Sequence, residues 1–193
     1  MIDHHLQCVF VHINKCGGIS VEKALGFDVQ MHPSLQEQQQ LFLQTRTLEQ
    51  WQSYFKFSFV RNPWDRLVSL YTFRRGKTPP QTLLPFSQWI RRVWEQELDH
   101  KAGGGRFLHW NQLDWLSVDG RLDMDFIGRV ENMAADFATV CTRLGIDNPG
   151  LGRYNTTQHR PYGSYYDAET RDLVARKYER DIEYFEYVFV ADC

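Results

Sequence analysis

The chain has little that would tie it to a membrane, a metal or nucleic acid. Its 193 residues contain no apolar run near the roughly 20 residues that cross a bilayer. The four cysteines are scattered and form no C-x-x-C pair, which argues against zinc and favours a reducing compartment. Lys and Arg number 22 against 24 Asp and Glu, so no global basic field attracts nucleic acid. A bound anion must therefore be held by local donors.

The first residues also lack the features of a targeting segment. MIDHHLQ has neither the basic start nor the apolar stretch of a secretory signal, and the first motif follows almost at once. We therefore expect a soluble cytoplasmic protein with no membrane span. The length predicts one domain over residues 1–193, in which residues 74–117 form an inserted helical segment that faces the acceptor. The sequence gives no oligomeric state.

Strand and helix signals alternate along the chain, which predicts an α/β fold with a central parallel sheet and helices on both faces. Capping-box patterns begin two stretches of one helical region. A stripe of apolar residues at i, i+3, i+4 and i+7 marks the helix that starts at Asn62-Pro63. The expected strands cover about residues 7–13, 55–61 and 126–130. The other expected helices cover about residues 34–54, 86–98, 131–144 and 167–185.

The stretch VFVHINKCGGIS, Val9 to Ser20, joins an apolar strand to a helix through two glycines. Such a turn can bring backbone N–H groups to an anion, and Lys15 and Ser20 add side-chain donors. The usual phosphate loop, G-x-x-x-x-G-K-[ST], is absent, because here the lysine precedes the glycines. Taken alone, the pattern fits either an anion site or a tight connection.

A second group of polar residues follows the strand FKFSFV. Arg61 stands at the strand end, where ligands bind in open α/β sheets. Arg66 and Ser69 lie three residues apart on the next helix, so Arg61, Ser69 and Arg66 could converge on one anion. For Arg66 we favour a solvated surface charge, since Asp65 is adjacent.

Both stretches resemble a known family. FVHINKCGGIS and FKFSFVRNPWDRLVSLY are similar to the two cofactor signatures of the carbohydrate-type, or family 2, sulfotransferases. QLDWLSVDGRLDMDFIGRVENMAADF and HRPYGSYYDAETRDLVARKYERDIEYFEY resemble the middle and C-terminal blocks of that family. Asn14 is a departure, since the family often has proline there. The resemblance implies a P-loop-like three-layer fold and 3′-phosphoadenosine 5′-phosphosulfate (PAPS) as the sulfuryl donor.

By this resemblance, the first loop holds the 5′-phosphosulfate, and Arg61 and Ser69 hold the 3′-phosphate. Arg160 lies in a loop whose family counterpart closes over the cofactor, so it is a candidate for a further phosphate contact. Lys15 can meet the bridging oxygen where charge develops, and no metal is needed. The expected cofactor-binding residues are Lys15, Cys16, Gly17, Gly18, Ile19, Ser20, Arg61, Ser69 and Arg160.

A general base is expected among the histidines. His32 lies between the two cofactor motifs, in a region where the family often carries an active-site histidine. An imidazole can accept a proton from an acceptor hydroxyl near neutral pH. We assign this role to His32, with Lys15 as the other catalytic residue. His159 is the main competitor, and His12 is expected to be buried and structural.

We therefore predict that the chain is a PAPS-dependent sulfotransferase. It is expected to transfer a sulfuryl group in line to a hydroxyl group and to release adenosine 3′,5′-bisphosphate. By resemblance, the acceptor is a carbohydrate or another small hydroxyl compound. Two alternatives stay open: a P-loop-type nucleotide kinase and a nucleotide-binding module without catalysis. Magnesium dependence separates the kinase from the sulfotransferase, and turnover of labelled PAPS separates the module.

Overall fold

The computed structural model describes residues 1–28, 32–75, 84–95, 108–152 and 159–191. The chain forms two compact units. The first unit comprises residues 1–61 and 112–155, and the second comprises residues 62–111 and 156–193. Within the described segments, no helix is both long and apolar enough to cross a bilayer.

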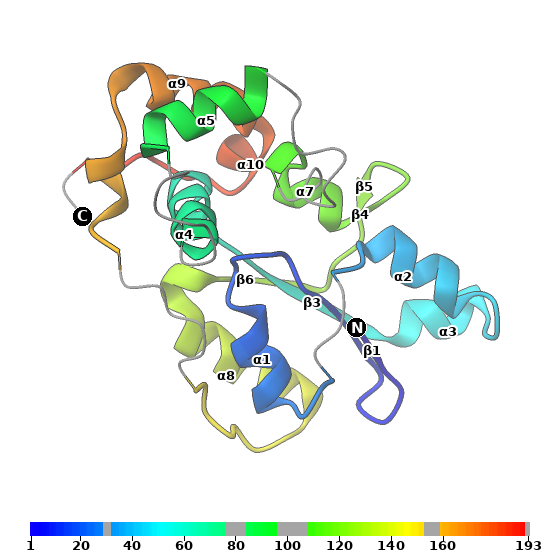
Figure 1. Cartoon of the computed structure of the whole chain (residues 1–193). Helices are drawn as coiled ribbons and strands as arrows, with labels where there is room; N and C mark the ends of the chain where they lie inside the picture. Colours follow the sequence, from blue (N-terminus) through cyan, green and yellow to red (C-terminus); the bar gives the residue numbers. More distant parts are fainter. Residues whose placement is uncertain (29–31, 76–83, 96–107, 153–158, 192–193) are drawn as a thin grey trace. The chain divides into compact units, whose positions relative to one another are not determined.

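The first unit is built on a four-stranded sheet in the order β1-β2-β3-β6 (Figure 1). Strands β2 (Cys8–Val11), β3 (Phe55–Val60) and β6 (Phe126–Arg129) are parallel. The edge strand β1 (Ile2–Asp3) pairs antiparallel with β2, so the sheet is mixed. The predicted α/β class and mostly parallel sheet are confirmed. The carboxyl ends of β2 and β3 are neighbours, and the polar residues of both expected cofactor motifs follow these ends.

One face of the sheet carries the main core of the first unit. The rings of Phe10 and Phe57 stack there with centroids 5.0 Å apart. Helices α1 (Gly18–Ala24) and α8 (Met133–Leu144) pack against this face, and the 3-10 turn η2 (Val130–Asn132) leads into α8 (Figure 1). Burial of these apolar side chains stabilises the unit and fixes α1 against the strand that precedes it.

Two short helices, α2 (Leu35–Phe42) and α3 (Leu48–Ser53), precede β3. The Lys56 side chain points to the opposite face of the sheet from Phe57 and lies over the Trp51 ring of α3, with 5.9 Å from Nζ to the ring centroid. Helices therefore cover both faces. Both predicted capping boxes are confirmed, since each N-cap side chain and N3 side chain satisfy one another's backbone N–H. The pairs are Ser34 with Glu37 and Thr47 with Gln50.

A short helix and a hairpin return the chain to the sheet. Helix α7 (Gln112–Trp115) is followed by β4 (Ser117–Val118) and β5 (Arg121–Leu122), which pair antiparallel. Asp119 and Gly120 form the two-residue turn, with φ of 48° and 76°. Asp-Gly is the dipeptide that such turns favour, so this hairpin, which was not among the expected strands, has a local sequence signal.

The second unit contains α4 (Pro63–Arg75) and α5 (Phe86–Glu95). The Asn62 side chain accepts a hydrogen bond from the Trp64 backbone N–H at 3.1 Å, as expected of the residue before a helix-starting proline. The expected break at residues 76–85 and the glycines at residues 103–105 fall mostly or wholly outside the described residues.

The C-terminal helical region of the second unit is interrupted, whereas we expected one helix over residues 167–185. The 3-10 helix η3 (Tyr162–Tyr165) is followed by α9 (Ala168–Lys177) and α10 (Glu179–Tyr184). Tyr178 separates the two helices with φ −112° and ψ 28°. Its ring is fully buried, and its hydroxyl donates to the Leu108 carbonyl, so tertiary contacts outweigh local helix propensity there.

Candidate active site

The loop between β2 and α1 is a tight turn with unusual backbone geometry. Lys15 has φ 64° and Gly17 has φ 76°, both in the left-handed region. The Cys16 N–H donates to the Ile13 carbonyl at 3.3 Å, and the Ser20 N–H donates to the Gly17 carbonyl at 3.0 Å. The first N–H groups of a helix have no intrahelical acceptor, so the amides that open α1 are suited to an anion.

The two glycines of this loop are required by packing as well as by conformation. A Cβ atom on Gly17 would lie 2.6 Å from the Met133 side chain. A Cβ atom on Gly18 would lie 2.0 Å from the His12 ring. The missing side chains therefore let α8 and His12 approach the loop closely, a reason for glycine that the sequence analysis did not identify.

Arg61 brings the second motif to the first. It directly follows β3, and its Nη1 donates to the Lys15 carbonyl oxygen at 3.2 Å. The strands before the two motifs are also linked, because the Ser58 hydroxyl donates to the Val11 carbonyl at 2.7 Å. Two residues that were expected to bind opposite ends of one nucleotide thus lie side by side in the first unit.

Gln112, the first residue of α7, joins both motifs and was missed by the sequence analysis. Its Oε1 accepts from the Arg61 backbone N–H at 2.8 Å, and its Nε2 donates to the Arg61 carbonyl at 2.9 Å. The same Oε1 accepts from the Cys16 thiol at 3.3 Å. Gln112 is fully buried. A single glutamine carries no local sequence signal for such a role.

His32 lies beside the strand that leads into the loop. Its Nδ1 is 3.0 Å from the His12 carbonyl oxygen, and the two imidazole rings meet edge to face with centroids 4.2 Å apart. A carbonyl only accepts hydrogen bonds, so Nδ1 carries the hydrogen in this contact and the lone pair of the neutral ring is on Nε2. His32 is half-buried.

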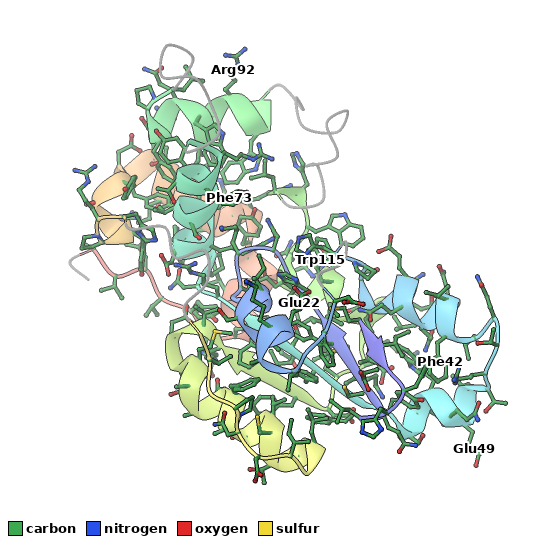
Figure 2. The ribbon with its side chains drawn as sticks, turned by 60° about the horizontal axis from the view of Figure 1, so that its bottom comes forward. Glu22, Phe42, Glu49, Phe73, Arg92 and Trp115 are labelled. Carbon is green, nitrogen blue, oxygen red and sulfur yellow. The ribbon has the colours of Figure 1, made fainter. Side chains whose placement is uncertain are left out.

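His12 is buried, as expected, and pairs with an acid that the sequence analysis did not consider. Its Nδ1 lies 2.7 Å from Oε1 of Glu22 on α1. Glu22 is fully buried, and its Oε2 has no hydrogen-bond partner among the described residues. Figure 2 marks Glu22 on α1 in the first unit. The pair fixes the orientation of the ring that packs against Gly18.

The other expected site residues lie in the second unit. Ser69 and Arg66 are on α4, and both are buried. The expectation that Arg66 is a solvated charge is wrong, because only 2% of the residue is exposed. Burial raises the pKa of the Tyr178 hydroxyl, and the positive charge of Arg66 acts in the opposite direction. All of α4 up to Tyr71, except the half-buried Asp65, is buried, so its polar residues are interior groups.

His159 and Arg160 also belong to the second unit. His159 Nδ1 donates to the Arg160 carbonyl at 2.8 Å, and its Nε2 lies 3.9 Å from Asp65. The Arg160 guanidinium lies over the Tyr165 ring, 5.1 Å from the centroid. Arg160 is exposed and reaches a pocket of about 420 Å³. The pocket is lined by aromatic, aliphatic and polar groups, among them Tyr71, Leu84, Phe86, Ser87 and Tyr165.

The expected site residues are therefore divided between the units. The whole first loop, Arg61 and His32 are in the first unit, where Arg61 contacts Lys15 and His32 contacts His12. Ser69 and Arg160 are in the second unit. Among the described residues, no cluster of three His, Cys, Asp or Glu side chains could hold a metal ion.

Comparisons with known proteins give one consistent family. The model of the sulfotransferase family matches residues 1–188. Carbohydrate sulfotransferase 10 of Xenopus laevis is 23% identical over 174 residues, which cover 72% of this chain and 49% of that protein. Carbohydrate sulfotransferase 10 of Danio rerio is 25% identical over 174 residues, which cover 70% of this chain and 47% of that protein.

A third relative, an uncharacterized protein of Archaeoglobus fulgidus, is 27% identical over 109 residues, which cover 56% of this chain and 82% of that protein. The chain spans about half the length of the carbohydrate sulfotransferases that it matches. No solved structure matches it significantly.

Proposed function

The chain belongs to the sulfotransferase family, and on this premise we propose that it transfers a sulfuryl group from PAPS to a hydroxyl group of an acceptor. The observation that carries the proposal is the contact between the two motifs, in which Arg61 Nη1 donates to the Lys15 carbonyl at 3.2 Å. Two cationic side chains at adjacent strand ends suit a nucleotide with two separate anionic groups.

The donors of the first unit fit the two ends of such a nucleotide. Lys15, the backbone amides at Gly17 to Ile19 and the Ser20 hydroxyl bind the 5′ end, and Arg61 binds the 3′-phosphate. PAPS supplies the activated sulfuryl group. Lys15 stabilises the negative charge that grows on the leaving phosphate oxygen, and its effect is largest in the transition state. Ser69 and Arg160 are proposed as further phosphate ligands.

His32 is the proposed general base. Because its Nδ1–H donates to the His12 carbonyl, Nε2 is the nitrogen that can accept the proton of an acceptor hydroxyl. The backbone carbonyl favours this tautomer of the ring. His32 also lies in the same unit as Lys15.

The acceptor is proposed to be a carbohydrate, which the names of the relatives support. Residues 74–117 are proposed to face it, within one sulfotransferase domain. Residues 84–87 of this segment line the pocket of the second unit, whose aromatic rings suit the apolar face of a sugar. A cytoplasmic location is also proposed. No disulfide links the three cysteines that the structure describes, Cys8, Cys16 and Cys141, and free thiols fit a reducing compartment.

A nucleotide kinase is the principal rival. A kinase of the P-loop type places its lysine and a Ser or Thr after the glycines, and the hydroxyl binds magnesium. Here Lys15 precedes Gly17 and Gly18. A non-catalytic nucleotide-binding module would have no need for a lysine at the bond that breaks, and turnover tests that alternative directly.

Calorimetry with two nucleotides tests the proposed binding mode. Adenosine 3′,5′-bisphosphate is expected to bind at least about tenfold more tightly than 5′-AMP, because each charged hydrogen bond to the 3′-phosphate contributes roughly 1.5–3 kcal/mol. Arg61→Ala should remove most of this preference. The matched control is Arg121→Ala, which deletes an exposed arginine of the same unit and should retain the preference.

Equal affinities in the wild-type protein would refute the assignment of the 3′-phosphate to Arg61 and Ser69. Turnover is tested separately, by incubating labelled PAPS with a panel of carbohydrates and with ATP-dependent kinase substrates. Transfer of label to a carbohydrate supports the proposal. Phosphoryl transfer from ATP with no use of PAPS would support the kinase instead.

A further inference from the structure

The Gln112 side chain completes the hydrogen bonding of a strand that has already ended. Strand β3 ends at Val60, and Gln112 pairs with both backbone groups of the next residue, Arg61. A side-chain amide has one acceptor and one donor in the same plane, so it can replace the peptide group of a neighbouring strand. Arg61 is thereby held in line with β3, one residue beyond the paired register of β3 with β6, which ends at Val60.

The same amide reaches the first motif. Oε1 accepts from the Cys16 thiol in addition to the Arg61 N–H, and Arg61 Nη1 donates to the Lys15 carbonyl. The contacts therefore form a closed ring through Gln112, Arg61 and the loop. Neither motif can shift along its strand without breaking at least one of these bonds.

Gln38 is a buried glutamine whose hydrogen bonds serve only the packing of the fold, and it can be compared with Gln112. Gln38 is also buried, and its Nε2 donates to the carbonyls of Phe10 and Pro33 at 3.3 Å. Those bonds satisfy a buried amide but reach neither Arg61 nor the loop of residues 15–20. Gln112, in contrast, forms hydrogen bonds with Arg61 and Cys16, which belong to the two proposed anion sites.

The position of Gln112 in the chain suggests a second reason for the contact. The chain leaves the first unit after Arg61 and re-enters it at Gln112. The pairing of Arg61 with Gln112 brings together the two ends of the intervening segment, residues 62–111. This closure alone would stabilise the fold but would not affect how the protein distinguishes nucleotides.

We propose that Gln112 is a positioning residue that fixes Arg61 relative to the loop of residues 15–20, so that both anionic ends of one nucleotide are bound at once. The inference rests on the proposed function. When the two sites are already held in place, binding of a bisphosphate does not include the entropic cost of ordering Arg61 and the loop. A ligand that uses the loop alone does not depend on this spacing.

The test is Gln112→Met, which keeps the length of the side chain and removes the amide's hydrogen bonds to Arg61 and Cys16. Calorimetry should show adenosine 3′,5′-bisphosphate binding weakened roughly tenfold to hundredfold, because a mispositioned Arg61 loses charged hydrogen bonds. Binding of 5′-AMP should weaken by less than about threefold, because this ligand needs only the loop. The discriminating quantity is the ratio of the two affinities, which general destabilisation does not change.

Gln38→Met is the matched control, since it also removes buried amide hydrogen bonds. It should lower the free energy of unfolding and leave the affinity ratio at the wild-type value. A second variant, Gln112→Glu, keeps the acceptor for Arg61 N–H and Cys16 but faces the Arg61 carbonyl with an oxygen. It should bind the bisphosphate weakly at pH 8 and recover as the pH falls, because a protonated carboxyl group again donates there.

Two outcomes overturn the inference and are distinguishable. If the wild-type protein prefers the bisphosphate and folded Gln112→Met keeps the same ratio, Gln112 is structural only and the proposed function stands. If the wild-type protein shows no preference, the proposed nucleotide assignment fails and the inference fails with it. Should Gln112→Met not fold, an unchanged ratio in Gln112→Glu at pH 8 also refutes the inference.

Discussion

Lys15 combines a strained backbone conformation with a charged side chain at the proposed anion site. Its φ of 64° is a conformation that costs a non-glycine residue on the order of 1 kcal/mol. Glycine would adopt it without strain but would remove the ammonium group. A strained residue between a strand and an anion loop suggests that the side chain serves function, which substitution can test.

Lys15→Ala is expected to lower kcat about a hundredfold or more while changing the affinity for adenosine 3′,5′-bisphosphate much less. The reason is that the ammonium group acts mainly on charge that develops as the leaving oxygen departs. Steady-state kinetics and calorimetry measure the two quantities separately. Lys23→Ala, which removes an exposed lysine of α1, is the control and should keep kcat. A normal kcat with a raised KM in Lys15→Ala would assign Lys15 to simple binding.

His32→Ala is expected to reduce kcat by roughly a hundredfold to ten-thousandfold, the usual range of general-base catalysis, with little change in PAPS affinity. Wild-type kcat should fall on the acid side of the pH profile, because protonation of Nε2 removes the base. The mutant should lack this acid limb. The measurement is a pH–rate profile at saturating substrates.

His159→Ala is the comparison for His32, because its Nδ1 also donates to a backbone carbonyl. Its Nε2 already faces the Asp65 carboxylate at 3.9 Å, so we expect the acid limb to persist in this variant. If His32→Ala retains the acid limb and His159→Ala loses it, the base is His159.

The helix ends and strands that the sequence predicted well are those determined by residues close together in the chain. The two capping boxes at Ser34 and Thr47 depend on side chains three residues apart, and both form. The alternation in residues 55–60 gave β3, and Gly145 ends α8 as expected. The interruption at Tyr178 was missed because its cause is a contact with Leu108, seventy residues away in the chain.

The contact between His12 and Gly18 allows a prediction for the loop and α1. Gly18→Ala is expected to destabilise the protein by about 1–3 kcal/mol, because the added Cβ atom would lie 2.0 Å from a ring that Glu22 holds in place. Urea unfolding measures the change. Gly26→Ala is the control for steric crowding, since among the described residues no atom beyond its chain neighbours lies within 4 Å of its Cβ position, although its φ of 70° adds backbone strain.

Removal of the ring should relieve the clash. The double variant His12→Ala with Gly18→Ala is expected to be more stable than the sum of the two single changes predicts, and a double-mutant cycle measures this coupling. Additive effects would mean that the loop backbone, and not His12, requires glycine at residue 18.

At the scale of the whole molecule, the sequence predicted the class of the fold, whereas the roles of the residues in the two motifs stay predictions. The loop at Lys15 and the strand end at Arg61 lie together as the strand order requires. Arg66 was misjudged because hydrophobic periodicity identifies one buried face, whereas α4 is buried nearly all round. The contacts of Gln112 could not be found from the sequence, because they form only when the chain returns to the first unit.

The last prediction concerns the reaction as a whole and separates sulfuryl from phosphoryl transfer. Transfer from labelled PAPS is expected to continue in EDTA, with a rate within about twofold of that in magnesium. The reason is that Lys15 and Arg61 supply the positive charge, and a sulfuryl group carries less negative charge than the phosphoryl group that kinases bind through magnesium. Initial rates in EDTA, in magnesium, and in EDTA with excess magnesium restored give the comparison. Loss of transfer in EDTA with recovery on magnesium would contradict metal independence, and recovery confined to ATP as donor would identify a kinase.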